Sequence, residues 1–314
     1  MRTFAATALI APPFPAVVHS AVGQITDHTA EWAAAFGLAS TPDGRARLSR
    51  ASAGELAARA CPEAPLPAVR LLADLITWLF AFDDRCDEDD LGTDPGRLAP
   101  VLAPLLEVLD RHGTAPHAAY QPAGATAAAL HDLCRRVRAM ARPVALPRFA
   151  TAMREYLLAM LWEASNRQLK RVPRFEEYVQ MRRLTGAVLP SFALTDLASD
   201  GLASTVDRID PRVVRLDLLA ADLVCWCNDV FSYGKERLHD AHNLATVIAF
   251  ELGWDEMAAL TEAAARFNAG VAAYVKLEAE VLDGADGPLT QMVYVRRRWL
   301  RATYDWSMNA TRYA

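Results

Sequence analysis

"LLADLITWLFAFDDRCDEDD", residues 71–90, joins a continuous apolar run to a block of acidic side chains. Its first half is rich in Leu, Ile, Trp and Phe at a spacing typical of a buried helix, which favours a helical fold. Its second half places six carboxylates between residues 83 and 90. Like charges this close repel one another on a helix. The block is therefore either a solvated helix end or a site for something strongly positive.

The helical pattern of this stretch continues through nearly the whole chain. Ala and Leu recur at three- and four-residue spacing, strand-like alternation is scarce, and segments rich in Gly, Pro and Asp separate the apolar runs. No linker or repeat divides the chain, so we expect one all-α domain spanning residues 1–314. The pattern predicts helices over residues 66–88, 97–111, 121–141, 147–169, 174–199, 211–237, 240–250, 254–282 and 288–310.

Composition narrows the classes of function. The 314 residues are 53% hydrophobic, with a formal net charge of −5 and a pI near 5.8, which argues against nucleic-acid binding because no basic excess balances a phosphate backbone. Five cysteines without a CxxC pair fit reduced thiols and predict a cytoplasmic protein. The apolar run before Pro12 is short for a secretion signal, and no uninterrupted apolar stretch is long enough to span a membrane.

The acidic block can present several carboxylates on one helix face. Asp83, Asp87 and Asp90 share a face at 100° per residue, and Asp84 projects to the side. Carboxylate oxygens are hard ligands of the kind that Mg²⁺ takes, together with water and phosphate oxygens. The alternative is an acidic helix end above a solvated loop, and this block alone does not separate the two readings.

A second polar cluster lies on another predicted helix. The stretch "NDVFSYGKE", residues 228–236, places Asn228, Ser232 and Glu236 four residues apart, so that all three share one face. An amide, a hydroxyl and a carboxylate without His or Cys suit Mg²⁺. The alternative is three ordinary helix polar residues, and Lys235 is either a surface charge or a phosphate donor. Two oxygen-bearing faces together suggest Mg²⁺ ions that hold a diphosphate from both sides.

One predicted helix has an internal fault. Gly186 and Pro190 fall within residues 174–199. Glycine weakens a helix interior by about 1 kcal/mol and proline by about 3 kcal/mol. A break there would expose backbone carbonyls inside the protein, whereas the alternative is a tolerated kink.

These features together resemble the bacterial class I terpene synthases, also called terpene cyclases. "DDRCD", residues 83–87, looks like their aspartate-rich motif, and residues 228–236 match their second metal-binding motif. Arg182 lies 46 residues before Asn228, where these enzymes usually keep an arginine that senses the diphosphate. Near the end of the chain, Arg312 and Tyr313 resemble the family's C-terminal RY pair. The resemblance runs from residue 83 to the C-terminus and is loose over the first 60 or so residues.

The resemblance implies a class I isoprenoid synthase fold, a single-domain helical bundle around a central cavity, and a metal-dependent site. It implies three Mg²⁺ ions, with Asp83 and Asp87 as ligands of two of them and Asp84 beside them. Asn228, Ser232 and Glu236 would hold the third ion. The expected donors to the diphosphate are Arg182, Asn228, Lys235, Arg312 and Tyr313.

The resemblance also implies how the reaction would be steered. Gly186 takes the effector position at the helix break, and Thr185 takes the linker position, where the family usually has Asp. The aromatic rings of Phe80 and Trp306 are candidates to stabilise a carbocation. The alternative for each ring is ordinary core packing.

The substrate expected from the resemblance is an isoprenyl diphosphate, with farnesyl diphosphate first and geranylgeranyl or geranyl diphosphate as alternatives. The protein would be a monomer or a homodimer. A prenyl-chain elongase would need a second aspartate-rich motif, and the "HD" pair within residues 238–243 has no partner cluster for a metal phosphohydrolase. A non-catalytic helical diphosphate-binding or interaction protein is the alternative from another class.

Overall fold

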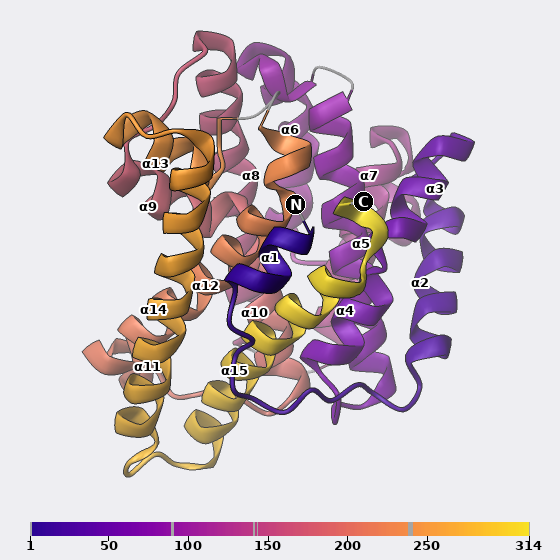
Figure 1. Ribbon diagram of the computed structural model, residues 1–314. Helices are drawn as coiled ribbons and strands as arrows, with labels where there is room; N and C mark the ends of the chain where they lie inside the picture. The colour runs from indigo at the N-terminus through magenta and orange to yellow at the C-terminus, as the bar shows by residue number, and fades with distance from the viewer. Residues whose placement is uncertain (1, 89–90, 141, 143, 238–240, 314) are drawn as a thin grey trace.

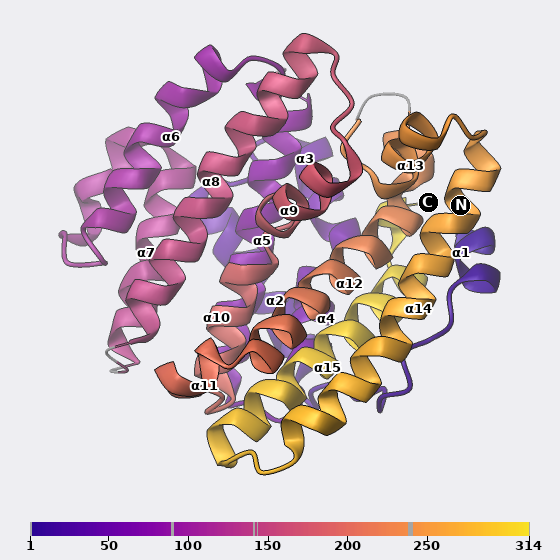
Figure 2. The ribbon, with the colours of Figure 1, turned by 90° about the vertical axis from the view of Figure 1, so that its left-hand side faces the viewer.

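The computed structural model describes residues 2–88, 91–140, 142, 144–237 and 241–313, with the side chains of residues 2–3, 87–88, 117 and 313 outside the description (Figures 1 and 2). The described residues form helices and connecting segments without a strand, which confirms the all-α prediction. The first half of the chain contains α1 Arg2–Ala8, α2 Val22–Phe36, α3 Pro42–Ala51, α4 Ala53–Ala60, α5 Leu66–Glu88, α6 Pro95–Asp110, α7 Ala125–Ala139 and α8 Ala145–Leu169. The second half contains α9 Phe175–Thr185, α10 Val188–Ala198, α11 Thr205–Ile209, α12 Pro211–Glu236, α13 Leu244–Leu252, α14 Glu256–Leu282 and α15 Gly287–Asn309. Three 3₁₀ turns accompany them, η1 Leu91–Thr93, η2 His117–Ala123 and η3 Thr311–Tyr313.

Aspartates at the N-caps explain where several long helices begin. Asp94, Asp210, Asp255 and Asp286 precede α6, α12, α14 and α15, and each side chain accepts a hydrogen bond from a backbone N–H of the first turn. An N-cap acceptor satisfies a donor that has no partner within the helix and is worth about 1 kcal/mol. The sequence therefore sets these starts locally, and the predicted ranges agree with them to within a few residues.

The helix fault at residues 185–190 is a real break. Helix α9 ends at Thr185, Ala187 takes the left-handed conformation with φ of 51°, and α10 begins at Val188. Pro190 then lies in the first turn of α10, where its missing N–H costs no helical hydrogen bond. A Cβ added to Gly186 would lie 2.6 Å from Sγ of Cys225, so glycine permits the close approach of α12.

Long helices surround the centre of the molecule. Helix α12 packs against both α14 and α15, which run beside it in Figure 2, and α5 contacts α4, α2 and α10. Aromatic side chains of α5 pack in the core, where Trp78 stacks on Phe82 with ring centroids 5.3 Å apart. The indole N–H of Trp78 donates to the carbonyl of Thr126 at 2.9 Å, which satisfies its polar atom inside the core.

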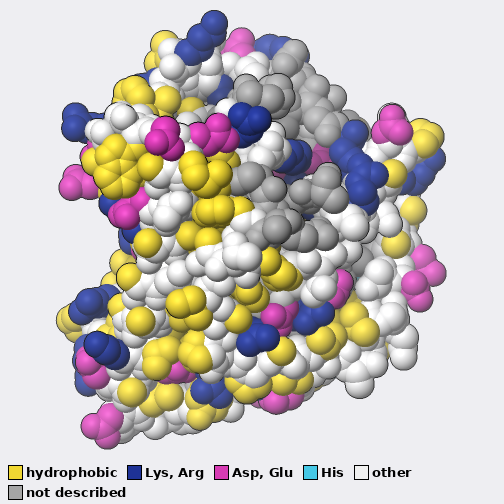
Figure 3. Space-filling model, viewed as in Figure 1, with side chains coloured by type: hydrophobic (Ala, Val, Ile, Leu, Met, Phe, Trp, Pro, Cys, Tyr) yellow, Lys and Arg dark blue, Asp and Glu magenta, His cyan; other side chains and the backbone are white. Residues whose placement is uncertain are grey.

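The surface mixes side chains of different kinds. Figure 3 shows Lys and Arg interspersed with Asp and Glu, with hydrophobic side chains between them, on the face seen in Figure 1. Among the described residues, no helix combines the length and the apolar character that crossing a bilayer requires. All five cysteines are buried and free.

Candidate active site

A cavity of about 800 Å³ lies between α4, α5, α8, α9, α10, α12 and α15. Both motifs singled out from the sequence reach it, one from α5 and the other from α12. The sequence-predicted site residues that line the cavity are Phe80, Asp83, Arg182, Gly186, Asn228, Lys235, Glu236, Trp306 and Arg312. Residues 232 positions apart along the chain therefore surround one space, as the two-motif prediction requires.

The other predicted site residues are not among those that line the cavity. Asp84 is buried beside the cavity wall, where its carboxylate lies 3.2 Å from Nη2 of Arg312 and 3.8 Å from Nε of Arg47. Ser232 is fully buried, and its hydroxyl donates to the carbonyl of Asp229 at 3.4 Å. The side chains of Asp87 and Tyr313 lie outside the described part of the structure.

The α5 side of the cavity joins charge to an aromatic stack. Nη2 of Arg312 lies 3.2 Å from a carboxylate oxygen of Asp83, and its guanidinium lies 4.5 Å above the ring of Phe80. Phe80 in turn stacks on Trp306 with ring centroids 5.8 Å apart. Burial raises the pKa of Asp83, and the charge of Arg312 opposes this effect. The carboxylate, the cation and both aromatic faces thus share one edge of the cavity.

The α12 side is organised by Arg182, which reaches across from α9. Its Nη2 donates to Oδ1 of Asn228 at 3.0 Å and to Oδ1 of Asp229 at 2.8 Å, and its Nε donates to the same Asp229 oxygen at 3.1 Å. Thr185, at the linker position, has a buried hydroxyl without a hydrogen-bond partner among the described residues. Arg182 thus pairs with the carboxylate of Asp229 and not with the hydroxyl of Thr185.

Asp229 is a site residue that the sequence reasoning did not single out. It is fully buried, and its second carboxylate oxygen accepts from the hydroxyl of Tyr178 and from the backbone N–H of Leu244 at 3.2 Å. Burial raises its pKa, and Arg182 and these hydrogen bonds offset the effect in part. Its position directly after Asn228 inside the second motif was the available signal.

Three further cavity residues come from segments without a recognised motif. Glu163 and Arg167 of α8 form an ion pair at 3.3 Å, and the charge of Glu163 contributes to the raised pKa of Asp83. His242 is buried, lines the cavity and contacts Nδ2 of Asn166 at 3.0 Å. Periodicity predicted α8 as a helix but did not show which of its side chains face the cavity.

The rest of the cavity wall is largely apolar. Its aliphatic and aromatic lining residues are Leu56, Ile76, Leu79, Phe80, Tyr156, Ala187, Val188, Val224, Trp299 and Trp306. Trp78 and Phe82 are fully buried and do not line the cavity, so these two rings pack in the core. The arrangement combines a charged region with an apolar chamber, which suits a ligand that has an anionic head and a hydrocarbon tail.

The donor set fits a hard divalent cation. Asp83, Asn228 and Glu236 each bring an oxygen to the cavity, and each of these oxygens accepts from a cationic or N–H donor: Arg312, Arg182 and Asn243, respectively. Among the described residues, no three acidic, His or Cys side chains lie close enough to hold a metal on their own. The ligands are thus divided between two helices, so that bound ions would also need oxygens from a substrate.

Comparison with known proteins identifies the family. Residues 74–273 match the family model described as terpene synthase family 2, C-terminal metal binding. A (+)-T-muurolol synthase of Roseiflexus castenholzii, named as farnesyl diphosphate cyclizing, is 36% identical over 96% of this chain and 92% of its own. A 4-epi-cubebol synthase of Streptosporangium roseum, also named as farnesyl diphosphate cyclizing, is 32% identical over 96% of this chain and 90% of its own.

The fold agrees with this assignment. A crystal structure of a variant of SVS_A2, a protein from ancestral sequence reconstruction, superposes with a TM-score of 0.87 at 25% identity and covers 96% of this chain and 88% of its own. The chain belongs to the terpene synthase family, as the sequence motifs predicted. It is a terpene cyclase, a carbon–oxygen lyase that acts on an isoprenyl diphosphate and uses a divalent metal.

Proposed function

We propose that the enzyme ionises farnesyl diphosphate with Mg²⁺, cyclises the resulting carbocation, neutralises it by loss of a proton or by capture of water with loss of its proton, and releases a cyclic terpene and diphosphate. The observation that supports this proposal is the single cavity of about 800 Å³ in which both oxygen-bearing motifs, the cationic side chains and the apolar wall meet. Farnesyl diphosphate is favoured over geranylgeranyl and geranyl diphosphate because the names of the two relatives specify it. We propose that residues 1–314 act as one catalytic domain.

The metal ligands of this proposal divide between the two motifs. Asp83, Asp84 and Asp87 would hold two Mg²⁺ ions, and Asn228, Ser232 and Glu236 would hold the third. The bound ions would neutralise the charge that grows on the diphosphate as the allylic C–O bond breaks. Arg312 and Arg182 now lie against Asp83 and Asn228, so both guanidiniums are within reach of an anion at the metal ligands.

The remaining residues bind and steer. Arg182, Lys235, Arg312 and Tyr313 would donate to phosphate oxygens, and an arginine suits this task because its planar fork offers several N–H donors. These interactions strengthen as negative charge moves onto the leaving group, so they favour the transition state over the ground state. Gly186, at the break between α9 and α10, lines the cavity, which supports the proposal that it takes the effector position.

The hydrocarbon part of the reaction takes place against the apolar wall. Phe80 and Trp306, stacked at 5.8 Å, offer aromatic faces to a carbocation. An aromatic face stabilises a desolvated cation by about 2 kcal/mol. The aliphatic lining excludes water that would end the cyclisation early.

The direct test is incubation of the purified protein with Mg²⁺ and each of the three isoprenyl diphosphates, followed by product analysis and measurement of released diphosphate. We expect turnover of farnesyl diphosphate and its loss in Asp83→Ala and in the double variant Asn228→Ala, Ser232→Ala, with helicity unchanged by circular dichroism. Asp110→Ala, an exposed carboxylate on α6, is the matched control and should retain activity. Absence of diphosphate release from all three substrates would refute the proposal, and turnover by either cavity variant would contradict the assigned roles.

A further inference from the structure

Asn243 lies just outside the second motif and touches it directly. Its side chain is fully buried, and Nδ2 donates to Oε2 of Glu236 at 3.0 Å and to the backbone carbonyl of Asp229 at 2.9 Å. Its Oδ1 accepts from the backbone N–H of Ala245 at 3.0 Å and caps α13. Because the cap occupies the amide oxygen, the amide nitrogen is the atom that faces Glu236.

This geometry fixes one carboxylate oxygen of Glu236. A glutamate side chain that is only partly buried samples several rotamers, and ordering it carries an entropic cost. The donor on Oε2 restrains that freedom and directs the carboxylate from outside the motif. Hydrogen bonds to a metal-ligating side chain from its surroundings change metal affinity or activity by about 10- to 100-fold when they are removed.

The same turn also fixes the partner of Arg182. The backbone N–H of Leu244 donates to Asp229 at 3.2 Å, on the carboxylate whose other oxygen accepts from Arg182. Asn243 therefore belongs to a turn that contacts α12 at Asp229 and at Glu236, which lie about two helical turns apart. The N-terminus of α13 thereby connects the metal-binding face of α12 to the arginine that crosses from α9.

We infer that Asn243 is a positioning residue that orients Glu236 for metal binding, in addition to its role as the N-cap of α13. The inference rests on the proposed function, because it takes Glu236 as a metal ligand. Asn243 itself contributes no oxygen to the cation, since its amide oxygen is used by the cap.

The test measures metal binding without turnover. Mn²⁺ with inorganic diphosphate serves as the probe, and electron paramagnetic resonance reports the bound ion. Asn243→Ser retains a capping oxygen, because serine is a good N-cap, but its side chain is too short to reach Glu236. We expect this variant to stay folded and to bind Mn²⁺ about tenfold more weakly than the wild type.

A double-mutant cycle separates positioning from a general structural effect. In the Glu236→Gln background, Asn243→Ser should cause no further loss of Mn²⁺ affinity, because the residue acts through Glu236. Asn268→Ser is the matched control, since Nδ2 of Asn268 also donates to a carbonyl and its Oδ1 accepts a backbone N–H, but on α14 against residues 8 and 10. This control should bind Mn²⁺ like the wild type.

Each outcome of these measurements either supports or overturns the inference. Unchanged Mn²⁺ affinity in Asn243→Ser, or an equal loss in both backgrounds, would overturn the inference. If Asn243→Ser unfolds, Asn243→Asp, which also keeps the cap and places a like charge against Glu236, must alter Mn²⁺ affinity in the wild-type background and much less with Glu236→Gln. A wild-type protein whose Mn²⁺ affinity depends on Glu236 and on Asn243 but that turns over no isoprenyl diphosphate would refute the proposed function and leave this inference standing.

Discussion

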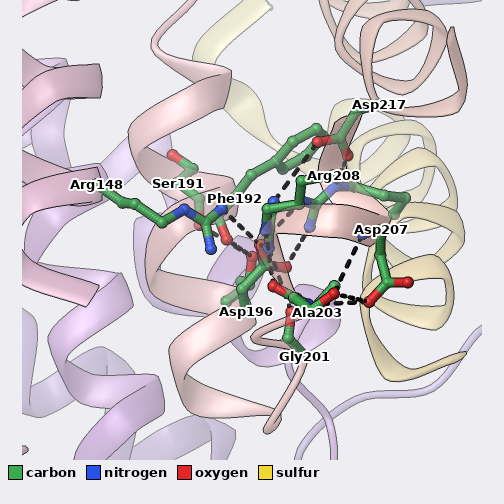
Figure 4. Close-up of polar contacts among 12 residues, drawn as sticks. Arg148, Ser191, Phe192, Asp196, Gly201, Ala203, Asp207, Arg208 and Asp217 are labelled. Atoms are coloured by element: carbon green, nitrogen blue, oxygen red, sulfur yellow. Dashed lines mark hydrogen bonds and ion pairs between the residues drawn. The ribbon is translucent and has the colours of Figure 1, made fainter. Parts of the chain in front are cut away.

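Asp196 in α10 and Asp229 in α12 are both fully buried and both paired with arginine, but their surroundings differ. Asp196 accepts from three arginines at once: from Arg296 at 2.5 and 3.0 Å, from Arg208 at 2.8 Å and from Arg148 at 3.3 Å. Figure 4 labels Arg208 and Arg148 beside Asp196. These side chains come from four helices and close on one another away from the catalytic cavity, and none of them lines it.

Among the described residues, Asp229 pairs with one arginine. Arg182 donates to it twice and continues to Asn228 on the cavity wall, so this network ends at the site where the substrate would bind. Asp229 therefore both neutralises the arginine and orients it toward the cavity.

The pKa values of Asp196 and Asp229 depend on how many arginines surround each carboxylate. Burial alone would raise the pKa of Asp196, but the attraction of its three arginines outweighs this effect and lowers the pKa. At Asp229 burial prevails over the attraction of Arg182, and the pKa is raised. The first network is thus electrostatically complete within the protein, whereas the second shares its cation with the active site. Changes at Asp196 should appear mainly in stability, and changes at Asp229 mainly in activity.

The largest expected effect is that of Asp196→Ala. The variant breaks the buried ion pair of Arg296, whose side chain is 1% exposed and keeps only Asp217, at 2.5 Å, as a carboxylate partner. Breaking a buried ion pair by removing one partner costs about 3–5 kcal/mol. Urea unfolding followed by circular dichroism measures the loss. Asp200→Ala is the control, because its pair with Arg142 is exposed and worth less than about 1 kcal/mol. Equal losses in the two variants would contradict the central role of Asp196.

Asp229→Asn should have the next largest effect, and it should fall on catalysis. The amide keeps the shape of the side chain but loses the charge that orients Arg182. We expect kcat/KM with farnesyl diphosphate to fall about 100-fold, as for a catalytic group displaced by about 1 Å. The loss of unfolding free energy should be smaller than that of Asp196→Ala. Wild-type kinetics in Asp229→Asn would contradict the role of Asp229 in orienting Arg182 for catalysis.

Much of the site could be predicted because its information is local. The faces that carry Asp83, Asn228 and Glu236 follow from helical periodicity, and the break near Gly186 follows from the residue types at positions 186 and 190. Helix starts were predictable for the same reason, since N-cap aspartates act within one turn. The described residues 2–60 form four helices that no such pattern had defined.

Contacts between distant segments could not be predicted in this way. Nothing at position 182 indicates that Arg182 pairs with Asp229 and not with Thr185, because that choice depends on how α9 crosses α12. Glu163 reaches the cavity through the packing of α8, and Asn243 reaches Glu236 through the start of α13. Each of these contacts depends on tertiary geometry that a single periodic pattern does not contain.

Gly186→Ala tests how closely α9 crosses α12, and its expected effect on stability is intermediate. The added Cβ would lie 2.6 Å from Sγ of Cys225, and overpacking of this kind costs about 1–3 kcal/mol. We expect a lower midpoint of thermal unfolding and partial recovery in the double variant with Cys225→Ala, which removes the sulfur. The carbonyl of Arg182 lies 2.9 Å from the same Cβ, so recovery should be incomplete. A midpoint equal to that of the wild type would show that α9 and α12 can separate freely at this point.

The smallest expected effect is a change in the pH dependence of stability, which depends on the number of cations around a buried aspartate. Asp222 has one arginine, Arg183, which donates to both of its oxygens at 2.7 and 2.8 Å. Burial raises the pKa of Asp222 above 3.8 despite that pair, whereas the pKa of Asp196 is lowered below 3.8. A raised pKa means that the folded state binds the proton of Asp222 more tightly than the unfolded state does. The contribution of Asp222 to the free energy of unfolding is therefore largest below pH 3.8 and is lost as the pH rises through the folded-state pKa. For Asp196 the contribution is full above pH 3.8 and is lost as the pH falls through the folded pKa.

Urea unfolding of the wild type, Asp196→Asn and Asp222→Asn between pH 3 and pH 7 measures both contributions. The stability difference between the wild type and Asp222→Asn should shrink as the pH rises from about 4, with a slope of at most about 1.4 kcal/mol per pH unit because one proton is exchanged. The difference for Asp196→Asn should stay constant over that range and shrink only in stronger acid. Parallel curves for the two variants would mean that three arginines protect a buried carboxylate no better than one, and the distinction between the two kinds of network would fail.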